Sequence, residues 1–252
     1  MTLLHYGPQE VEAVLFDLDD VLVPFQTPAA WQWAWRPQGP VLGDRRVKAA
    51  VRRALKAWDR RRWQGLTGKA PPADLAALRS HLAETLATVA GHALPAPETE
   101  AVVRRFLRPA GEVERYDDVP RCLDRLRSAG VKFGTVTPLP AENARWLLHR
   151  CGLPETLLVG AGDGPGPTVP DRAAFRAAAS ALGATLDRVA YVGDLFWSDV
   201  RAAARAGLAA VLLDRRDAWT KVLTGRLTTL DALESTLAAG DALPEGAGVD
   251  AE

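Results

Sequence analysis

The chain has 252 residues, of which 48% are hydrophobic and 25% charged, and its 31 basic and 31 acidic side chains leave no net charge. This composition is typical of a globular protein and gives no reason to expect nucleic acid or a membrane surface as a partner. No apolar run approaches the roughly 20 residues that span a bilayer, and the amino terminus does not resemble a signal peptide. We therefore expect a cytoplasmic protein in which both cysteines, Cys122 and Cys151, are reduced.

The first expected element is a buried strand over residues 10–17, and two carboxylates follow directly at its end, Asp17 and Asp19. Side chains two positions apart in an extended segment point the same way. At the carboxyl end of a buried parallel strand they would lie where α/β sheets bind ligands. There Asp17 is placed to attack an electrophile and Asp19 to move a proton.

Residues 27–115 show no strand alternation and predict an all-helical insertion with helices over 44–63, 73–89 and 99–107. The segment contains sixteen Lys and Arg against eight Asp and Glu. Two interpretations stay open: a field that attracts an anionic ligand, or arginines that form the solvated faces of helices. Trp31 and Trp35 likewise either line a substrate pocket or pack the small helical domain.

From Tyr116 onward, helices alternate with short apolar strands, which predicts a parallel sheet with helices on both faces. The expected helices cover 118–129, 141–150, 171–182 and 198–206, and the strands 131–137, 156–159, 188–192 and 208–213. The predicted fold class is therefore α/β: a doubly wound, Rossmann-like core (residues 1–26 and 116–239) with an inserted helical domain (27–115). Residues 240–252 are expected to form a disordered tail.

Further polar residues follow the later strands: Thr137 after the second, and Asp194 and Asp199 after the strand over 188–192. The carboxyl ends of parallel strands meet at one edge of a sheet, so these side chains are expected to gather around Asp17 and Asp19. Clustered carboxylates repel one another unless a cation neutralises them, and all-oxygen ligands suit Mg²⁺. In such a site the Thr137 hydroxyl would bind the oxygens of a transferring phosphoryl group.

These motifs, in this order and spacing, resemble the haloacid dehalogenase superfamily of Mg²⁺-dependent phosphohydrolases over residues 10–25 and 115–235. The resemblance implies that Asp17 is the nucleophile and forms a phospho-aspartate, with Asp19 as general acid and base. It implies a Mg²⁺ site made by Asp17, Asp194 and the backbone carbonyl of Asp19, supported by Asp199. The helical insertion resembles the family's C1 cap, and the carboxylate at Asp19 points to phosphate chemistry rather than dehalogenation.

The sequence departs from the family at the third motif, where Val169 stands at the position of a phosphate-binding lysine. Arg172, one helical turn further on, is the candidate replacement, and its alternative is a solvent-facing residue. Two functions follow: a phosphatase acting on a small phosphorylated substrate, or an impaired relative that binds a phosphorylated ligand or a protein partner. Trp197, within the fourth motif, would contact a ligand or close the cap. The sequence leaves substrate identity and oligomeric state open.

Overall fold

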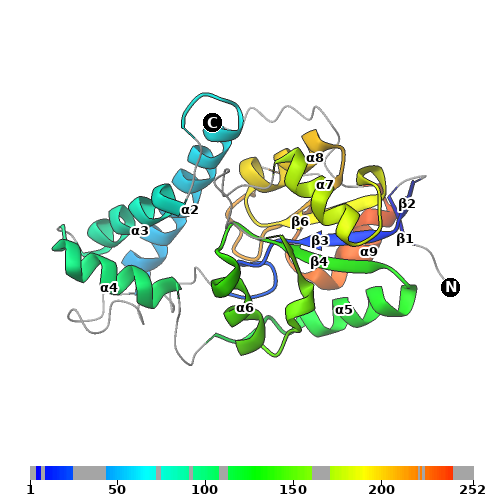
Figure 1. Ribbon diagram of the computed structural model, residues 1–252, viewed down its shortest axis with the longest axis horizontal. Helices are drawn as coiled ribbons and strands as arrows, with labels where there is room; N and C mark the ends of the chain where they lie inside the picture. Colours follow the sequence, from blue (N-terminus) through cyan, green and yellow to red (C-terminus); the bar gives the residue numbers. More distant parts are fainter. Residues whose placement is uncertain are drawn as a thin grey trace.

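A parallel sheet forms the centre of the protein (Figure 1). The computed structural model describes residues 4–6, 9–24, 44–71, 75–90, 93–107, 113–160, 171–220, 222 and 225–240. Within them six parallel strands follow the order β5-β4-β3-β6-β7-β8. Their bounds are Ala13–Phe16 (β3), Lys132–Val136 (β4), Leu158–Gly160 (β5), Val189–Gly193 (β6), Ala209–Leu213 (β7) and Arg226–Leu227 (β8). A short antiparallel ribbon, β1 (Leu4–Tyr6) and β2 (Gln9–Val11), precedes β3.

Helices cover both faces of the sheet (Figure 1). One apolar layer joins Ala13 and Leu15 of β3 to α7 and α8, and the other joins Val14 and Phe16 to α5, α6 and α9. These helices span Asp118–Ala129 (α5), Ala141–Arg150 (α6), Arg172–Ala181 (α7), Arg201–Ala206 (α8) and Leu233–Ala238 (α9). Because successive side chains of a strand face opposite sides, a strand buried on both faces must be apolar throughout. The predicted doubly wound α/β core is confirmed.

Local signals end and begin these helices as the sequence indicates. Gly130 ends α5 with φ of 76°, a left-handed conformation that glycine adopts without steric cost. The Asp171 carboxylate accepts a hydrogen bond from Ala174 N at 2.8 Å and so caps α7. Cys122 and Cys151 are buried free thiols, and no helix among the described residues is long and apolar enough to cross a membrane.

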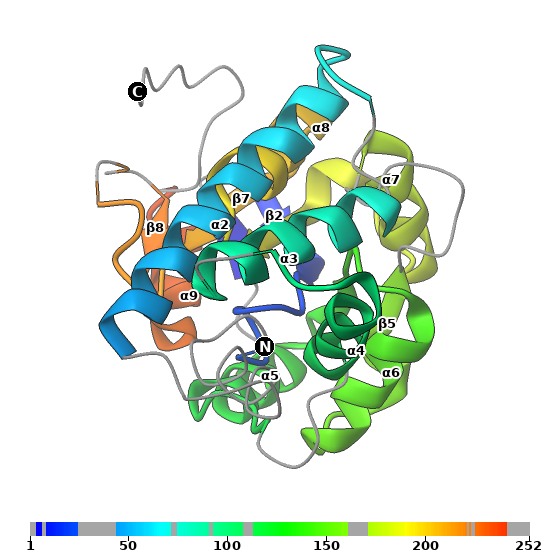
Figure 2. The same ribbon diagram turned by 90° about the vertical axis from the view of Figure 1, so that its left-hand side faces the viewer.

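Three helices separate β3 from α5 in the described part of the chain, and we call them the helical insertion. They are α2 (Asp44–Leu66), α3 (Leu75–Ala90) and α4 (Ala96–Leu107). The insertion lies beyond the carboxyl ends of the strands (Figure 1), and α2 extends across the core at this end, close to α8 (Figure 2). The boundaries of the insertion at residues 27 and 115, and the tail at 240–252, stay predictions because most of the residues concerned lie outside the described ranges.

The structure differs from the expected elements in three places. The strand expected over 10–17 is divided at Glu12, because β2 pairs with β1 whereas β3 pairs with β4 and β6. The helix expected from Ser198 begins at Phe196 as a π-helical turn, η4 (Phe196–Val200), before α8. Three elements, β1, β8 and α9, were not expected. Short 3₁₀ turns, η2 (Glu155–Leu157), η3 (Leu186–Arg188) and η5 (Leu230–Ala232), connect the remaining elements.

Candidate active site

Three carboxylates meet where β3 and β6 end. Asp17 directly follows β3, Asp194 directly follows β6, and Asp199 lies in η4. The register pairs Phe16 with Val192, and Asp17 N donates to the carbonyl oxygen of Val192 at 2.9 Å. One carboxylate oxygen from each of the three aspartates lies within 4.8 Å of the others. The structure therefore brings together the side chains that the sequence places at separate strand ends.

Burial and mutual repulsion make this cluster electrostatically unfavourable on its own. Asp17 is 3% exposed, Asp194 9% and Asp199 fully buried. The pKa of Asp17 is raised well above its usual value, first by burial and then by the charge of Asp199. The pKa of Asp194 is raised in the same way, by burial and then by Asp20 and Asp199. Such a site favours either protons or a cation that lets the carboxylates ionise together.

A tight turn after β3 holds Asp19 beside Asp17. The carbonyl oxygen of Leu18 accepts hydrogen bonds from Leu22 N and Val23 N, each at 3.1 Å, and closes the turn. Asp20 has φ of 57°, and its carboxylate binds the Arg216 guanidinium at 2.6 Å and the Tyr116 hydroxyl. Asp19 is 8% exposed, and its charge contributes to the raised pKa of Asp17.

Thr137 lies at the same edge of the sheet, one strand away from Asp17. It follows β4, which pairs with β3, and its side chain is buried. Thr137 N donates to the carbonyl oxygen of Gly160 at 3.1 Å, and its hydroxyl oxygen accepts from Leu139 N at 3.3 Å. The hydroxyl is thus held in a fixed turn at the end of the strand.

Among the described residues, no hydrogen bond or ion pair joins Arg172 to this cluster. It is an exposed residue at the first position of α7 and lines a surface hollow of about 320 Å³ with Trp63, Leu66 and Arg205, among others. The charged groups that act most strongly on Asp17 are instead Asp199, Arg62 and Asp19. The role assigned to Arg172 stays a prediction, and Val169 lies outside the described residues.

Two residues of α2 also reach the cluster, and neither was predicted from the sequence. Arg62 is 1% exposed, and its Nη1 lies 2.9 Å from Asp199 Oδ1. Asp59 is fully buried and accepts hydrogen bonds from the backbone N–H groups of Trp197, at 3.0 Å, and Ser198, at 2.7 Å. Burial raises the pKa of Asp59 to about 6. The interpretation of the basic residues as solvated helix faces is therefore wrong for Arg62.

A sequence signal for Arg62 exists in retrospect. The apolar positions Val47, Val51, Leu55 and Trp58 recur every three or four residues along α2, and Arg62 is the next position of the same stripe. A charged residue that continues an apolar stripe is either at the end of the buried face or paired inside the protein. Here it is paired, because α2 packs against η4 and brings Arg62 to Asp199.

Aromatic residues also pack at the contact between α2 and η4. The rings of Trp63 and Trp197 lie 5.9 Å apart, and the Arg201 guanidinium lies over both, at 5.2 and 4.9 Å from their centroids. Trp197 therefore contacts the helical insertion, as one of its two predicted roles requires. Trp31 and Trp35 lie outside the described residues.

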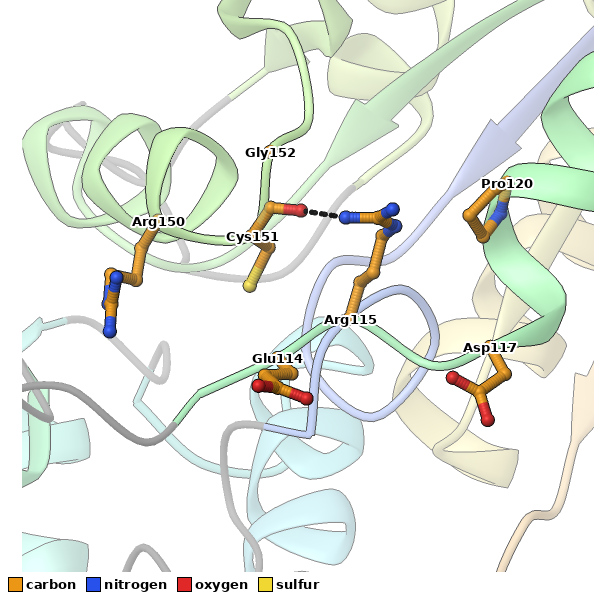
Figure 3. Close-up of a pocket in the computed structure, with 7 residues that line it drawn as sticks. All are labelled: Glu114, Arg115, Asp117, Pro120, Arg150, Cys151 and Gly152. Atoms are coloured by element: carbon orange, nitrogen blue, oxygen red, sulfur yellow. Dashed lines mark hydrogen bonds between the residues drawn. The ribbon is translucent and has the colours of Figure 1, made fainter.

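A larger hollow lies elsewhere on the core (Figure 3). It has a volume of about 470 Å³ and lies between the end of α6 and the segment that leads into α5. Arg115 crosses it and donates to the carbonyl oxygen of Cys151 at 2.7 Å (Figure 3). Its lining residues are Glu114, Arg115, Asp117, Pro120, Arg150, Cys151 and Gly152. None of the clustered carboxylates lines it, so size alone does not identify the site.

Comparisons with known proteins concern the family and the fold. A model of the haloacid dehalogenase-like hydrolases matches residues 11–207. A predicted phosphoglycolate phosphatase from Haemophilus somnus is 20% identical with a TM-score of 0.56, covering 81% of this chain and 85% of its own. A hydrolase of the same family from Deinococcus radiodurans, with bound phosphate and sodium, is 20% identical with a TM-score of 0.61, covering 93% and 98%.

A dehalogenase with an intermediate complex is also similar, at 18% identity and a TM-score of 0.63, covering 91% of this chain and 98% of its own. At such identities these structures establish the fold alone. No curated protein sequence matches this chain.

Proposed function

Because this chain belongs to the haloacid dehalogenase-like hydrolases, we propose that it is a Mg²⁺-dependent phosphatase acting on a small phosphomonoester through Asp17. The observation that carries the proposal is the approach of the Asp17, Asp194 and Asp199 carboxylates to within 4.8 Å, with Asp19 beside them. A carboxylate cluster with only a structural role would lower the stability of the fold without compensation. In a catalytic site, the same carboxylates bind a cation and act on a phosphoryl group.

The donor set fits Mg²⁺. It consists of carboxylate oxygens, which are hard ligands, and the buried Asp17 Oδ1 has no hydrogen-bond partner among the described residues. Asp17 and Asp194 would hold the ion with the backbone carbonyl of Asp19, and Asp199 would support them. When bound, Mg²⁺ supplies positive charge that keeps these carboxylates ionised and offsets the charge of a phosphoryl group.

The remaining chemistry belongs to the protein's own side chains. A carboxylate oxygen of Asp17 attacks phosphorus, the bond to the ester oxygen breaks, and the Asp19 carboxyl gives that oxygen a proton. Water then attacks the phosphorus of phospho-Asp17 and loses a proton to Asp19, which releases phosphate and restores both carboxyl groups. Thr137, held at the end of β4, donates a hydrogen bond from its hydroxyl to a phosphoryl oxygen.

The setting also supports a small substrate in the cytoplasm. The helical insertion packs against η4, beside the carboxylates, and such a cover excludes water from a compact ligand more readily than from a large one. Both cysteines are free thiols, which accords with a reducing compartment. We infer that the insertion acts as a cap of the C1 type.

The test is phosphate release from a panel of small phosphomonoesters with Mg²⁺, with Asp17→Asn as the inactive control. Release that disappears with EDTA and in Asp17→Asn supports the proposal. No release by a protein that still binds Mg²⁺ would instead favour the second candidate, an impaired relative that binds a phosphorylated ligand. A haloacid substrate panel run in parallel tests for dehalogenation, the activity of the similar dehalogenases.

A further inference from the structure

The sequence leaves the phosphate site without its expected cation. Val169 occupies the lysine position, and the only lysines after residue 100 are Lys132 and Lys221. Lys132 is exposed and begins β4, so it lies at the opposite edge of the sheet from Asp17, and Lys221 is outside the described residues. A phosphoryl group next to four aspartates needs a positive charge from the protein in addition to a metal.

Arg62 is the cation that the structure places beside the nucleophile. Its guanidinium is buried, pairs with Asp199 through Nη1 at 2.9 Å, and lies close enough to Asp17 for the two charges to attract. Two of its donor nitrogens, Nε and Nη2, have no acceptor among the described residues, and Asp17 Oδ1 has no donor among them. Unpaired buried guanidinium N–H groups are costly, so this arrangement points to an acceptor that arrives with the ligand.

A second residue of the same helix fixes Arg62 in place. Asp59 lies three positions earlier, on the same face of α2, and accepts hydrogen bonds from two backbone N–H groups of η4. The turn that carries Asp199 is therefore bound twice by α2, once through Asp59 and once through Arg62. This double attachment holds the guanidinium at a defined distance from the carboxylate cluster.

Resting on the phosphatase function proposed above, we propose that Arg62 of the helical insertion is the phosphate-binding cation of the active site, in place of the lysine that the core lacks. Its free Nε–H and Nη2–H donate to two phosphoryl oxygens while Nη1 stays on Asp199. A guanidinium presents such paired donors in a fixed plane, which suits bidentate binding of phosphate.

A consequence follows for catalysis. The cation is carried by the insertion and the nucleophile by the core, so the phosphate site is complete only while α2 is docked on η4. Arg62 is 1% exposed in this docked state, so a phosphate group reaches it only after α2 has moved away from η4. Closure of the insertion over a bound phosphomonoester would then both exclude water and supply the missing charge.

The alternative is that Arg62 only neutralises Asp199. A purely structural ion pair would affect stability and leave phosphate binding unchanged. The experiment therefore measures binding of orthovanadate and inorganic phosphate by calorimetry in the presence of Mg²⁺, together with KM and kcat for p-nitrophenyl phosphate. Arg62→Gln is compared with the wild-type protein and with Arg60→Gln, which alters an exposed arginine of the same helix. Circular dichroism establishes that each variant is folded.

The expected result is a loss of about ten- to hundredfold in phosphate and vanadate affinity for Arg62→Gln, with Arg60→Gln unchanged and Arg62→Lys intermediate. Wild-type affinity in a folded Arg62→Gln would overturn the inference, whether or not the enzyme turns over. A third result separates the two proposals. If the wild-type protein binds phosphate but hydrolyses no ester, and Arg62→Gln no longer binds phosphate, the phosphatase proposal fails while the anion site stands.

A second pair of variants covers the case in which Arg62→Gln does not fold. The double variant Arg62→Met/Asp199→Asn removes both charges of the ion pair, so neither member is left buried without the other. Its control is Asp199→Asn alone, which keeps the arginine. Phosphate binding at least about tenfold weaker in the double variant than in its control supports the inference, and equal binding overturns it.

Discussion

The attachment of α2 to the core can be tested through Asp59→Asn. The Asp59 carboxylate accepts two hydrogen bonds from η4 inside the protein, and burial raises its pKa from 3.8 to about 6. The folded protein therefore binds the Asp59 proton more tightly than the unfolded chain does. The resulting stability is fully present below about pH 4 and is lost as the pH rises through about 6.

The size of the effect follows from the two pKa values. The contribution of Asp59 protonation to the free energy of unfolding is about 3 kcal/mol at low pH and is lost completely at high pH. About 1.4 kcal/mol of this loss falls between about pH 5 and pH 8. The asparagine does not titrate, and its single carbonyl oxygen satisfies only one of the two N–H groups well, at a cost of about 1–3 kcal/mol that does not depend on pH. Asp59→Asn is thus expected to be less stable than the wild-type protein at about pH 5, by a difference that shrinks by about 1.4 kcal/mol at about pH 8.

Urea denaturation of both proteins at the two pH values measures this difference. Glu84→Gln, which alters an exposed acid of α3, is the matched control and should follow the wild-type pH dependence. Identical pH dependence in Asp59→Asn and the wild-type protein would refute the reasoning, because it would mean that Asp59 is not enclosed against η4. The docked position of α2 would then be wrong.

Four further predictions concern the site. Gly193→Ala places a Cβ 2.7 Å from Asp199 Cβ and 2.9 Å from Tyr191 Cε1, so we expect urea denaturation to show about 1–3 kcal/mol of lost stability, together with a lower kcat. Gly160→Ala is the control, because its Cβ meets only ordinary van der Waals contacts. Arg172→Ala should leave kcat within about twofold, since Arg172 is exposed and lines a hollow that none of the clustered carboxylates lines; a tenfold loss would restore its predicted role. Mg²⁺ should raise the melting temperature more at about pH 8 than at about pH 5, because ligation requires ionised Asp17 and Asp194, whose pKa values are raised; equal shifts would place the ion elsewhere. Val169→Lys should change turnover by less than about threefold in the wild-type background but increase the turnover of Arg62→Gln. A strong gain in the wild-type background would show that Arg62 does not supply a cation to the phosphate site.

The sequence predicts the core well because the relevant signals are local. Apolar strands buried on both faces, glycines after helices and the Asp171 cap each act within a few residues. The alternation of strands and helices then predicts a parallel sheet, and in such a sheet Asp17 and Asp194 lie at the same edge. A two-residue strand such as β8 carries no readable alternation, so it escapes such reasoning.

The contribution of α2 could not be predicted in the same way. Arg62 and Asp199 are distant in the chain, and their contact depends on how the insertion docks on η4. The same docking caps the start of η4, because Asp59 accepts hydrogen bonds from the N–H groups of Trp197 and Ser198 there. The sequence of a basic helix predicts that its arginines face solvent, and only the tertiary structure shows which of them is buried.

The most direct test of the account is to trap the phosphorylated enzyme. Asp19→Asn is mixed with radiolabelled p-nitrophenyl phosphate and Mg²⁺, quenched with acid within one turnover, and mapped by peptide analysis. The leaving group of this substrate needs no proton, so Asp17 is still phosphorylated, whereas water is no longer activated to remove the phosphoryl group. We expect label on Asp17 that hydroxylamine releases and that Asp17→Asn lacks. Phosphate release by the wild-type protein without any label on Asp17 in the trapped variant would contradict it.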